Sequence, residues 1–143
     1  MRGQSHDESD NGLALALAAT GAQAQLPKDK EKLSEQCDKQ AAERFAKDWV
    51  SSHSAEGHLV SGNYKNHYNF RLNKCFYLEV MNAQDRAEPP YTIMTLYDLN
   101  GSLEIASYSK VEGVDAPSIC VVQDKKCKSE QEWRSLLKPF MED

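Results

Sequence analysis

Three histidines lie close together in this sequence, where they could hold a metal ion. His53, His58 and His67 fall within a stretch of fifteen residues, and imidazole nitrogens are common ligands of zinc and copper. The spacing of five between His53 and His58 matches neither one face of a helix nor one face of a strand. No acidic residue is placed to complete a site. We therefore expect solvent-exposed loop histidines, with a metal site at these three residues as the alternative.

Two other arrangements of reactive residues each lack an essential part. Cys75 with His67 would make a nucleophile and its base only if the Cys75 thiol were free. Asp98, Asn100 and Gly101 resemble part of a calcium loop, but the twelve-residue frame and its final bidentate glutamate are missing. Motifs for serine hydrolases, phosphate loops and dinucleotide binding do not occur. The sequence thus predicts no cofactor, and it favours a protein that is not an enzyme.

The tyrosines form the set that favours ligand binding. The chain has six, at Tyr64, Tyr68, Tyr77, Tyr91, Tyr97 and Tyr108. A tyrosine side chain combines a large apolar ring with a polar tip, which suits an interface. We predict that Tyr91, Ile93, Tyr97 and Tyr108 line a binding surface. The alternative is ordinary core and half-buried strand tyrosines.

A helix over residues 30–51 should follow a polar linker at residues 25–29. Apolar residues recur every fourth position, at Leu33, Cys37, Ala41, Phe45 and Trp49, with Ala42, Ala46 and Val50 beside them. This spacing makes one apolar stripe along a helix. Residues 51–63 contain two glycines and read as a loop.

Five strands follow in the predicted order. They comprise residues 64–73, 73–82, 91–99, 102–111 and 118–123. The second is rich in strand-forming residues and is expected at the centre of the sheet. Asn100-Gly101 between the third and fourth predicts a two-residue type I′ turn. That turn would place one apolar set on the core face: Met94, Leu96, Leu103 and Ile105. The opposite face would carry Ile93, Thr95, Tyr97, Leu99, Glu104, Ala106 and Tyr108.

A second helix should begin after Ser129, which forms a capping box with Glu132. Trp133, Leu136, Leu137 and Phe140 form its apolar face, and Pro139 is expected to end or kink it. The fold class is therefore α+β: an antiparallel sheet of about four or five strands with an N-terminal and a C-terminal helix packed on it.

Composition and charge exclude some classes of protein. The chain has 143 residues, 40% of them hydrophobic, which suits one packed domain over residues 25–143. Its net charge of -5 argues against nucleic-acid binding, which requires clustered Lys and Arg. No apolar run approaches the roughly 20 residues of a transmembrane helix.

The N-terminus suggests export. The apolar run at residues 13–19, followed by Ala22-Gln23-Ala24, resembles the core and cleavage site of a signal peptide. The first ten residues carry three acids against Arg2, whereas a signal peptide begins with positive charge. We interpret residues 1–24 as a truncated signal-peptide-like or vector-derived leader; an Ala/Leu-rich N-terminal extension is the alternative.

Four cysteines without a Cys-x-x-Cys spacing favour disulfides over zinc or redox chemistry. Cys120 and Cys127 flank a tight turn, which favours their local pairing. Cys37 would then join the first helix to Cys75 in the central strand. Two crossed pairings stay open, as do four reduced thiols if the protein is not exported.

Several motifs resemble small exported bacterial proteins of uncharacterised function. They are His67-Tyr68-Asn69, Leu72-Asn73-Lys74-Cys75-Phe76, and the tail that contains Cys120, Cys127-Lys128-Ser129, Glu132-Trp133, Leu137 and Met141-Glu142. The resemblance covers residues 30–143 and implies export and two disulfides, but no activity. We predict a non-enzymatic periplasmic or secreted module that binds a protein or small molecule. The alternative is a secreted hydrolase or metal-binding protein that uses the His53–His67 region.

Overall fold

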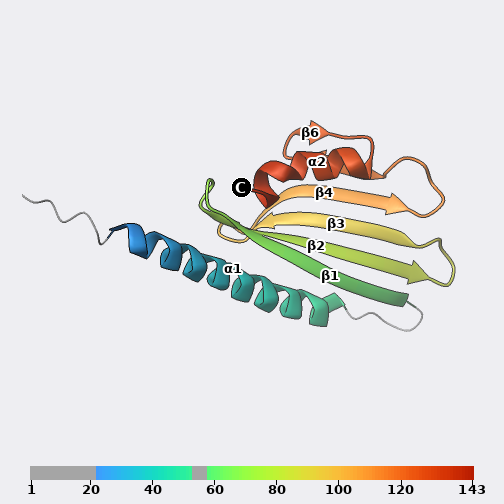
Figure 1. Cartoon of the computed structure of the whole chain (residues 1–143). Helices are drawn as coiled ribbons and strands as arrows, with labels where there is room; N and C mark the ends of the chain where they lie inside the picture. Colours follow the sequence, from blue (N-terminus) through green and yellow to red (C-terminus); the bar gives the residue numbers. More distant parts are fainter. Residues whose placement is uncertain (1–21, 53–57) are drawn as a thin grey trace, which may run out of the picture.

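One antiparallel sheet of six strands organises the chain in a computed structural model that describes residues 22–52 and 58–143 (Figure 1). The elements are α1 (Ala22–Ser52), β1 (His58–Asn69), β2 (Lys74–Asp85), β3 (Tyr91–Asp98), β4 (Leu103–Val111), β5 (Ile119–Val122), β6 (Lys125–Lys126) and α2 (Glu130–Met141). The strands follow one another across the sheet in chain order. The α+β prediction is confirmed, with β6 as a short strand where a turn was expected.

Helix α1 packs along β1 on one face of the sheet, and its first turns project beyond the sheet (Figure 1). It begins at Ala22, within the predicted leader and ahead of the predicted linker. Cys37 and Ala41 are buried, whereas Ala42 and Ala46 are exposed. The buried stripe is therefore narrower than predicted. Residues 1–21 of the predicted leader lie outside the described residues.

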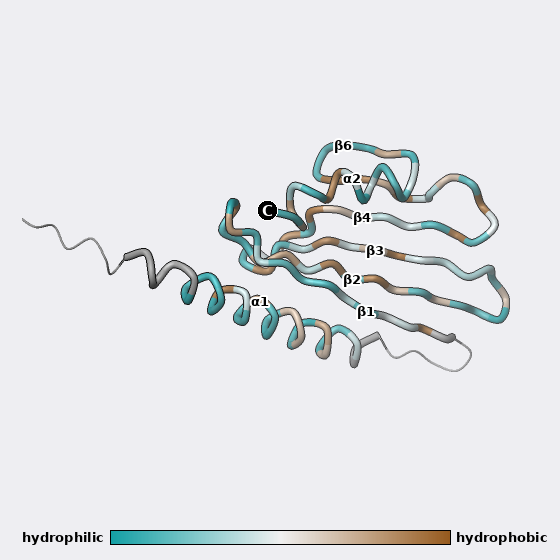
Figure 2. Tube along the Cα trace, viewed as in Figure 1, coloured by the Kyte–Doolittle hydropathy of each residue, from teal (hydrophilic) through white to brown (hydrophobic). Residues whose placement is uncertain are grey.

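Strand β1 begins six residues earlier than predicted, at His58, and ends four residues earlier, at Asn69. It pairs with β2 over twelve positions, from His58 opposite Asp85 to Asn69 opposite Lys74. Figure 2 shows that β1 is mostly hydrophilic, whereas β2 and β3 carry much of the apolar character. Gly62, which we interpreted as a loop residue, lies under α1: a Cβ there would be 2.7 Å from Cζ3 of Trp49. The role of this glycine is therefore to leave room for the tryptophan ring above the strand, and not to form a turn.

The main core lies between α2 and the other sheet face. Its buried members are Phe76, Leu78, Met94, Leu96, Ala106, Tyr108, Val122, Trp133 and Leu137. The Trp133 ring is fully buried, and its Nε1–H donates to the Val121 carbonyl at 3.1 Å. This bond satisfies the one polar atom of the ring, so α2 docks through a side chain with no unpaired polar group.

Helix α2 begins as predicted but ends later than predicted. The Ser129 hydroxyl accepts from the Glu132 N–H at 3.1 Å. The Glu132 carboxylate accepts from the N–H of Lys128, at 2.9 Å, and not from that of Ser129. The helix continues through Pro139 to Met141, so of the two expectations, an end or a kink at the proline, the end does not occur.

The β3–β4 connection differs from the predicted type I′ turn. Asp98 pairs with Leu103, which leaves four residues in the loop, and the left-handed residue is Ser102, with φ of 52°. Leu96 of β3 pairs with Ala106 of β4, but the next residue, Tyr97, pairs with Glu104, so β4 has one extra residue at this bulge. The register therefore shifts by one. Consequently Ala106 and Tyr108 lie on the core face, and their assignment to the opposite face is wrong.

Both preferred disulfides are present. Cys37–Cys75 links α1 to β2, with Cα atoms 5.4 Å apart. Cys120–Cys127 links β5 to the segment before α2, with Cα atoms 5.0 Å apart. No described cysteine is free. Each helix of the structure is thus held near the sheet by one covalent bond.

Candidate ligand-binding site

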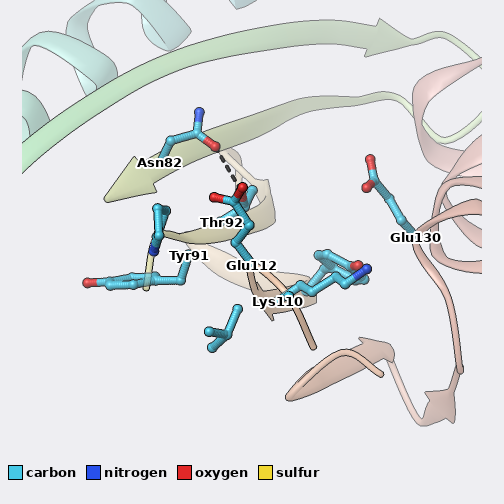
Figure 3. Close-up of a pocket in the computed structure, with 10 residues that line it drawn as sticks. Asn82, Tyr91, Thr92, Lys110, Glu112 and Glu130 are labelled. Carbon is cyan, nitrogen blue, oxygen red and sulfur yellow. Dashed lines mark hydrogen bonds between the residues drawn. The ribbon is translucent and has the colours of Figure 1, made fainter. Parts of the chain in front are cut away.

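A depression of ≈ 450 Å³ lies between one end of strands β2, β3 and β4 and the first residue of α2 (Figure 3). Its polar lining comes from strand ends, from the loop after β4 and from α2: Asn82, Tyr91, Thr92, Tyr108, Lys110, Glu112 and Glu130. Its size suits a small molecule, since ligand pockets usually span about 300–1,000 Å³.

Strand register places three polar side chains of the depression in one row. Asn82 of β2 pairs with Thr92 of β3, and Thr92 pairs with Lys110 of β4. Thr92 and Lys110 lie two positions from the core residues Met94 and Tyr108, and Asn82 lies two positions from Val80, which packs against the same core. All three therefore share the core face of the sheet. The Thr92 hydroxyl donates to Oδ1 of Asn82 at 2.8 Å (Figure 3). The Asn82 Nδ2 makes no hydrogen bond to a described residue, so it is available as a donor.

Tyr108 is the most deeply buried polar residue of the depression. It is 2% exposed, and its ring lies 5.7 Å from that of Trp133, centroid to centroid. Burial raises its pKa above the ordinary value, and the charge of Glu130 raises it further, while Arg134 lowers it. The hydroxyl therefore stays protonated at neutral pH. It makes no hydrogen bond to any residue in the described part of the chain, which leaves a donor without a partner.

Opposite charges line the depression without pairing with each other. Lys110 is half-buried and forms no ion pair with a described residue. Glu130 instead accepts from Arg134, at 2.8 Å. The backbone N–H of Glu112 donates to the Pro90 carbonyl at 2.7 Å, and its exposed carboxylate forms no ion pair within the described residues. In Figure 3, Lys110 extends toward the side where Glu130 lies, away from Glu112.

The four residues predicted to form a binding surface lie in two environments. Tyr91 and Tyr108 both line the depression, from β3 and β4. Ile93 lies on the opposite face of β3 and is half-buried. Tyr97 also lies on that opposite face, where the Arg44 guanidinium sits 4.9 Å from its ring centroid.

The tyrosines on the α1 face form an internal aromatic cluster. The rings of Phe45 and Tyr64 are 4.9 Å apart, those of Tyr64 and Tyr77 5.5 Å, and those of Tyr77 and Tyr97 6.1 Å. The Tyr77 hydroxyl donates to Glu79 at 2.9 Å. Burial raises the pKa values of Tyr77 and Tyr97. These contacts bind the helix to the sheet, which makes this cluster part of the packing.

The histidines proposed as a metal site are not brought together. His53 lies outside the described residues. His58 and His67 are nine residues apart on β1, which corresponds to about 30 Å at the usual rise of a strand. The described residues contain no group of three metal-ligating side chains. His67 Nε2 is buried, lies 3.5 Å from Oδ1 of Asp143, and makes no hydrogen bond to a described residue.

The sequence interpretation missed most of the polar lining. In β2, β3 and β4, every second residue faces the core. Near one end of each strand this series passes from apolar residues to a polar one, which is Asn82, Thr92 or Lys110. This change from apolar to polar is visible in the sequence. It could not be used for β4, because the predicted register placed Lys110 on the wrong face.

Comparison of the chain with models of known families, with curated proteins and with solved structures finds no match. Among the described residues, none of the helices is long and apolar enough to span a membrane.

Proposed function

We propose that this protein is an exported, non-enzymatic binding module that holds a small polar ligand in the depression. The observation that carries the proposal is the Tyr108 hydroxyl, which belongs to a residue 2% exposed, lines the depression and has no partner in the described part of the chain. Among the described residues, His67 Nε2 is the buried side-chain atom without a hydrogen bond, so the Tyr108 oxygen is open to the depression rather than sealed in the core. A ligand oxygen in the depression can accept from this hydroxyl in place of water.

A periplasmic or secreted location is supported by the two disulfides. Cys37 and Cys75 are each 1% exposed and form the bond between α1 and β2. Disulfides of this structural kind persist in oxidising compartments and are rare where glutathione keeps thiols reduced. The signal-like leader and the resemblance to exported bacterial proteins support the same location.

The experiment is an NMR titration of the ¹⁵N-labelled protein with single small polar compounds. The probes are free amino acids, D-glucose, D-glucuronate and succinate. We expect at least one probe to shift the resonances of Thr92, Lys110 and Gly113, all of which line the depression. Tyr108→Phe, which removes only the hydroxyl, should weaken that binding about tenfold. Tyr97→Phe is the matched control, because it removes a hydroxyl on the opposite face and should leave binding unchanged. The proposal fails if no probe shifts these resonances.

A further inference from the structure

We infer that the ligand of the depression is a small zwitterion with a carboxylate and an ammonium group, as in a free amino acid. The inference rests on the proposed function and adds the chemical class of the ligand. It comes from the arrangement of hydrogen-bond donors and acceptors around the depression, which separate into a donor group and an acceptor group.

The donor group suits a carboxylate. Lys110 Nζ and the Tyr108 hydroxyl make no hydrogen bond or ion pair to a described residue, and both residues line the depression. Asn82 Nδ2 also makes no such bond, but Figure 3 shows it pointing away from Thr92 and Lys110, so it is not part of this group. Lys110 and Tyr108 lie two positions apart on the same face of β4, about 7 Å from each other at the backbone. A carboxylate has two oxygens with about four acceptor sites, so it can bind several such donors at once. Bonds to a charged carboxylate are also stronger than neutral ones.

The acceptor group suits an ammonium. Glu112 carries a carboxylate without an ion pair among the described residues, and Figure 3 shows it on the same side of the depression as Tyr91. The Tyr91 ring is 37% exposed. An ammonium held by a carboxylate near an aromatic ring gains both a charge-assisted hydrogen bond and a cation–π attraction.

Other ligand classes would leave one of these groups unsatisfied. An apolar ligand would cover Lys110 and Tyr108 without offering an acceptor, which is costly for both groups. A simple carboxylate would suit Lys110 but would place its charge in the same depression as Glu112. A neutral sugar would exclude water from Lys110 and Glu112 without supplying the opposite charge that either one lacks. A zwitterion supplies a partner for both.

The test is a binding series by NMR and calorimetry on the full chain. The twenty common L-amino acids are titrated singly, at millimolar concentration. Every one that shifts Thr92, Lys110 and Gly113 is compared with its N-acetyl derivative and its amide. We expect at least one amino acid to bind, and each blocked form, which lacks one of the two charges, to bind about tenfold more weakly or worse.

Charge-removing variants show whether the two ends bind where we infer. Lys110→Met should weaken binding of the free amino acid and of its N-acetyl form, which both carry a carboxylate. Glu112→Gln should weaken binding of the free amino acid and of its amide, which both carry an ammonium group. Lys65→Met and Glu88→Gln remove the same charges at exposed sites outside the depression, so they should leave binding unchanged. A thermal melt of each variant confirms that it is folded.

Three outcomes would overturn the inference. The first is an N-acetyl derivative that binds as tightly as the free amino acid, which would indicate a simple carboxylate ligand. The second is binding unchanged by Lys110→Met in a folded variant. The third is that none of the amino acids shifts the resonances of the residues that line the depression. If D-glucose, D-glucuronate or succinate shifts the same resonances in that third case, the binding module stands and only the ligand class is wrong. If none of these three compounds shifts them either, both proposals fail.

Discussion

The side chain of Asn69 connects the β1–β2 turn to the end of α2. Its Nδ2 lies 3.0 Å from the carbonyl oxygen of Pro139 and 3.1 Å from those of Phe140 and Glu142, while its Oδ1 accepts from the Leu72 N–H at 2.9 Å. The last carbonyls of a helix lack partners within the helix. A fully buried amide therefore serves as a helix C-cap that comes from another part of the chain.

Asn69→Ala should lower the free energy of unfolding by about 2–4 kcal/mol, because several buried polar groups would lose their partner at once. Urea denaturation followed by tryptophan fluorescence measures this change. Asn63→Ala is the matched control on the same strand. Its side chain is exposed, so the expected loss is under about 0.5 kcal/mol. Equal effects of the two substitutions would contradict the assigned role of Asn69.

At the scale of elements, each disulfide joins a helix or its flanking segment to the sheet. Cys37–Cys75 closes a separation of 38 residues, and Cys120–Cys127 closes one of 7. In the chain-entropy model a bond that closes a longer loop restricts the unfolded chain more strongly. The first disulfide should therefore stabilise the protein more than the second.

The variant with Cys37→Ala and Cys75→Ala should lose about 4 kcal/mol of unfolding free energy, and the variant with Cys120→Ala and Cys127→Ala about 2.5 kcal/mol. Urea denaturation of the two double variants gives both values. Intact mass under non-reducing conditions should show four hydrogens fewer than the reduced chain. A reversed order of the two losses would mean that loop length does not govern their stabilities here.

The elements that the sequence predicted well are those with local signals. The four-residue spacing of Leu33, Cys37 and Ala41 requires only a helix, and Ser129 caps Glu132 within one turn. The bounds of strand β1 were predicted poorly because its strand character depends on pairing with β2 rather than on its own residues. Its local residues, rich in Asn, favour turns.

At the scale of the whole molecule, both sheet faces bury tyrosines, and this makes stability depend on pH. The pKa values of Tyr77 and Tyr97 beneath α1, and of Tyr108 beneath α2, are raised above the ordinary value of 10.0, with burial as the largest cause. Above about pH 10 the unfolded chain releases these protons first, so it binds fewer protons than the folded chain. The contribution of these three tyrosines to stability is therefore complete below about pH 10, and the free energy of unfolding falls as the pH rises further.

Urea denaturation at about pH 8, 10 and 11 should show a loss of stability that begins near pH 10. The double variant with Tyr97→Phe and Tyr108→Phe should lose less stability over the same interval, because it lacks two of the three groups. Tyrosinate absorbance provides an independent reading, since three of the six tyrosines should ionise only at higher pH or on unfolding. An identical decline in wild type and double variant would contradict this explanation.

The sequence by itself determined the α+β order of elements, the preferred cysteine pairs and the helix cap. These features arise from spacing along the chain, and spacing can be read without knowing what lies next to it in space. Only the tertiary structure decided which face each residue of β4 occupies. A one-residue bulge after Leu96 reverses the predicted alternation and brings Tyr108 and Lys110 beside Thr92 and Asn82. Strand register depends on how two paired strands meet, including bulges that residue alternation along one strand does not reveal, and for that reason the depression became visible only in the folded chain.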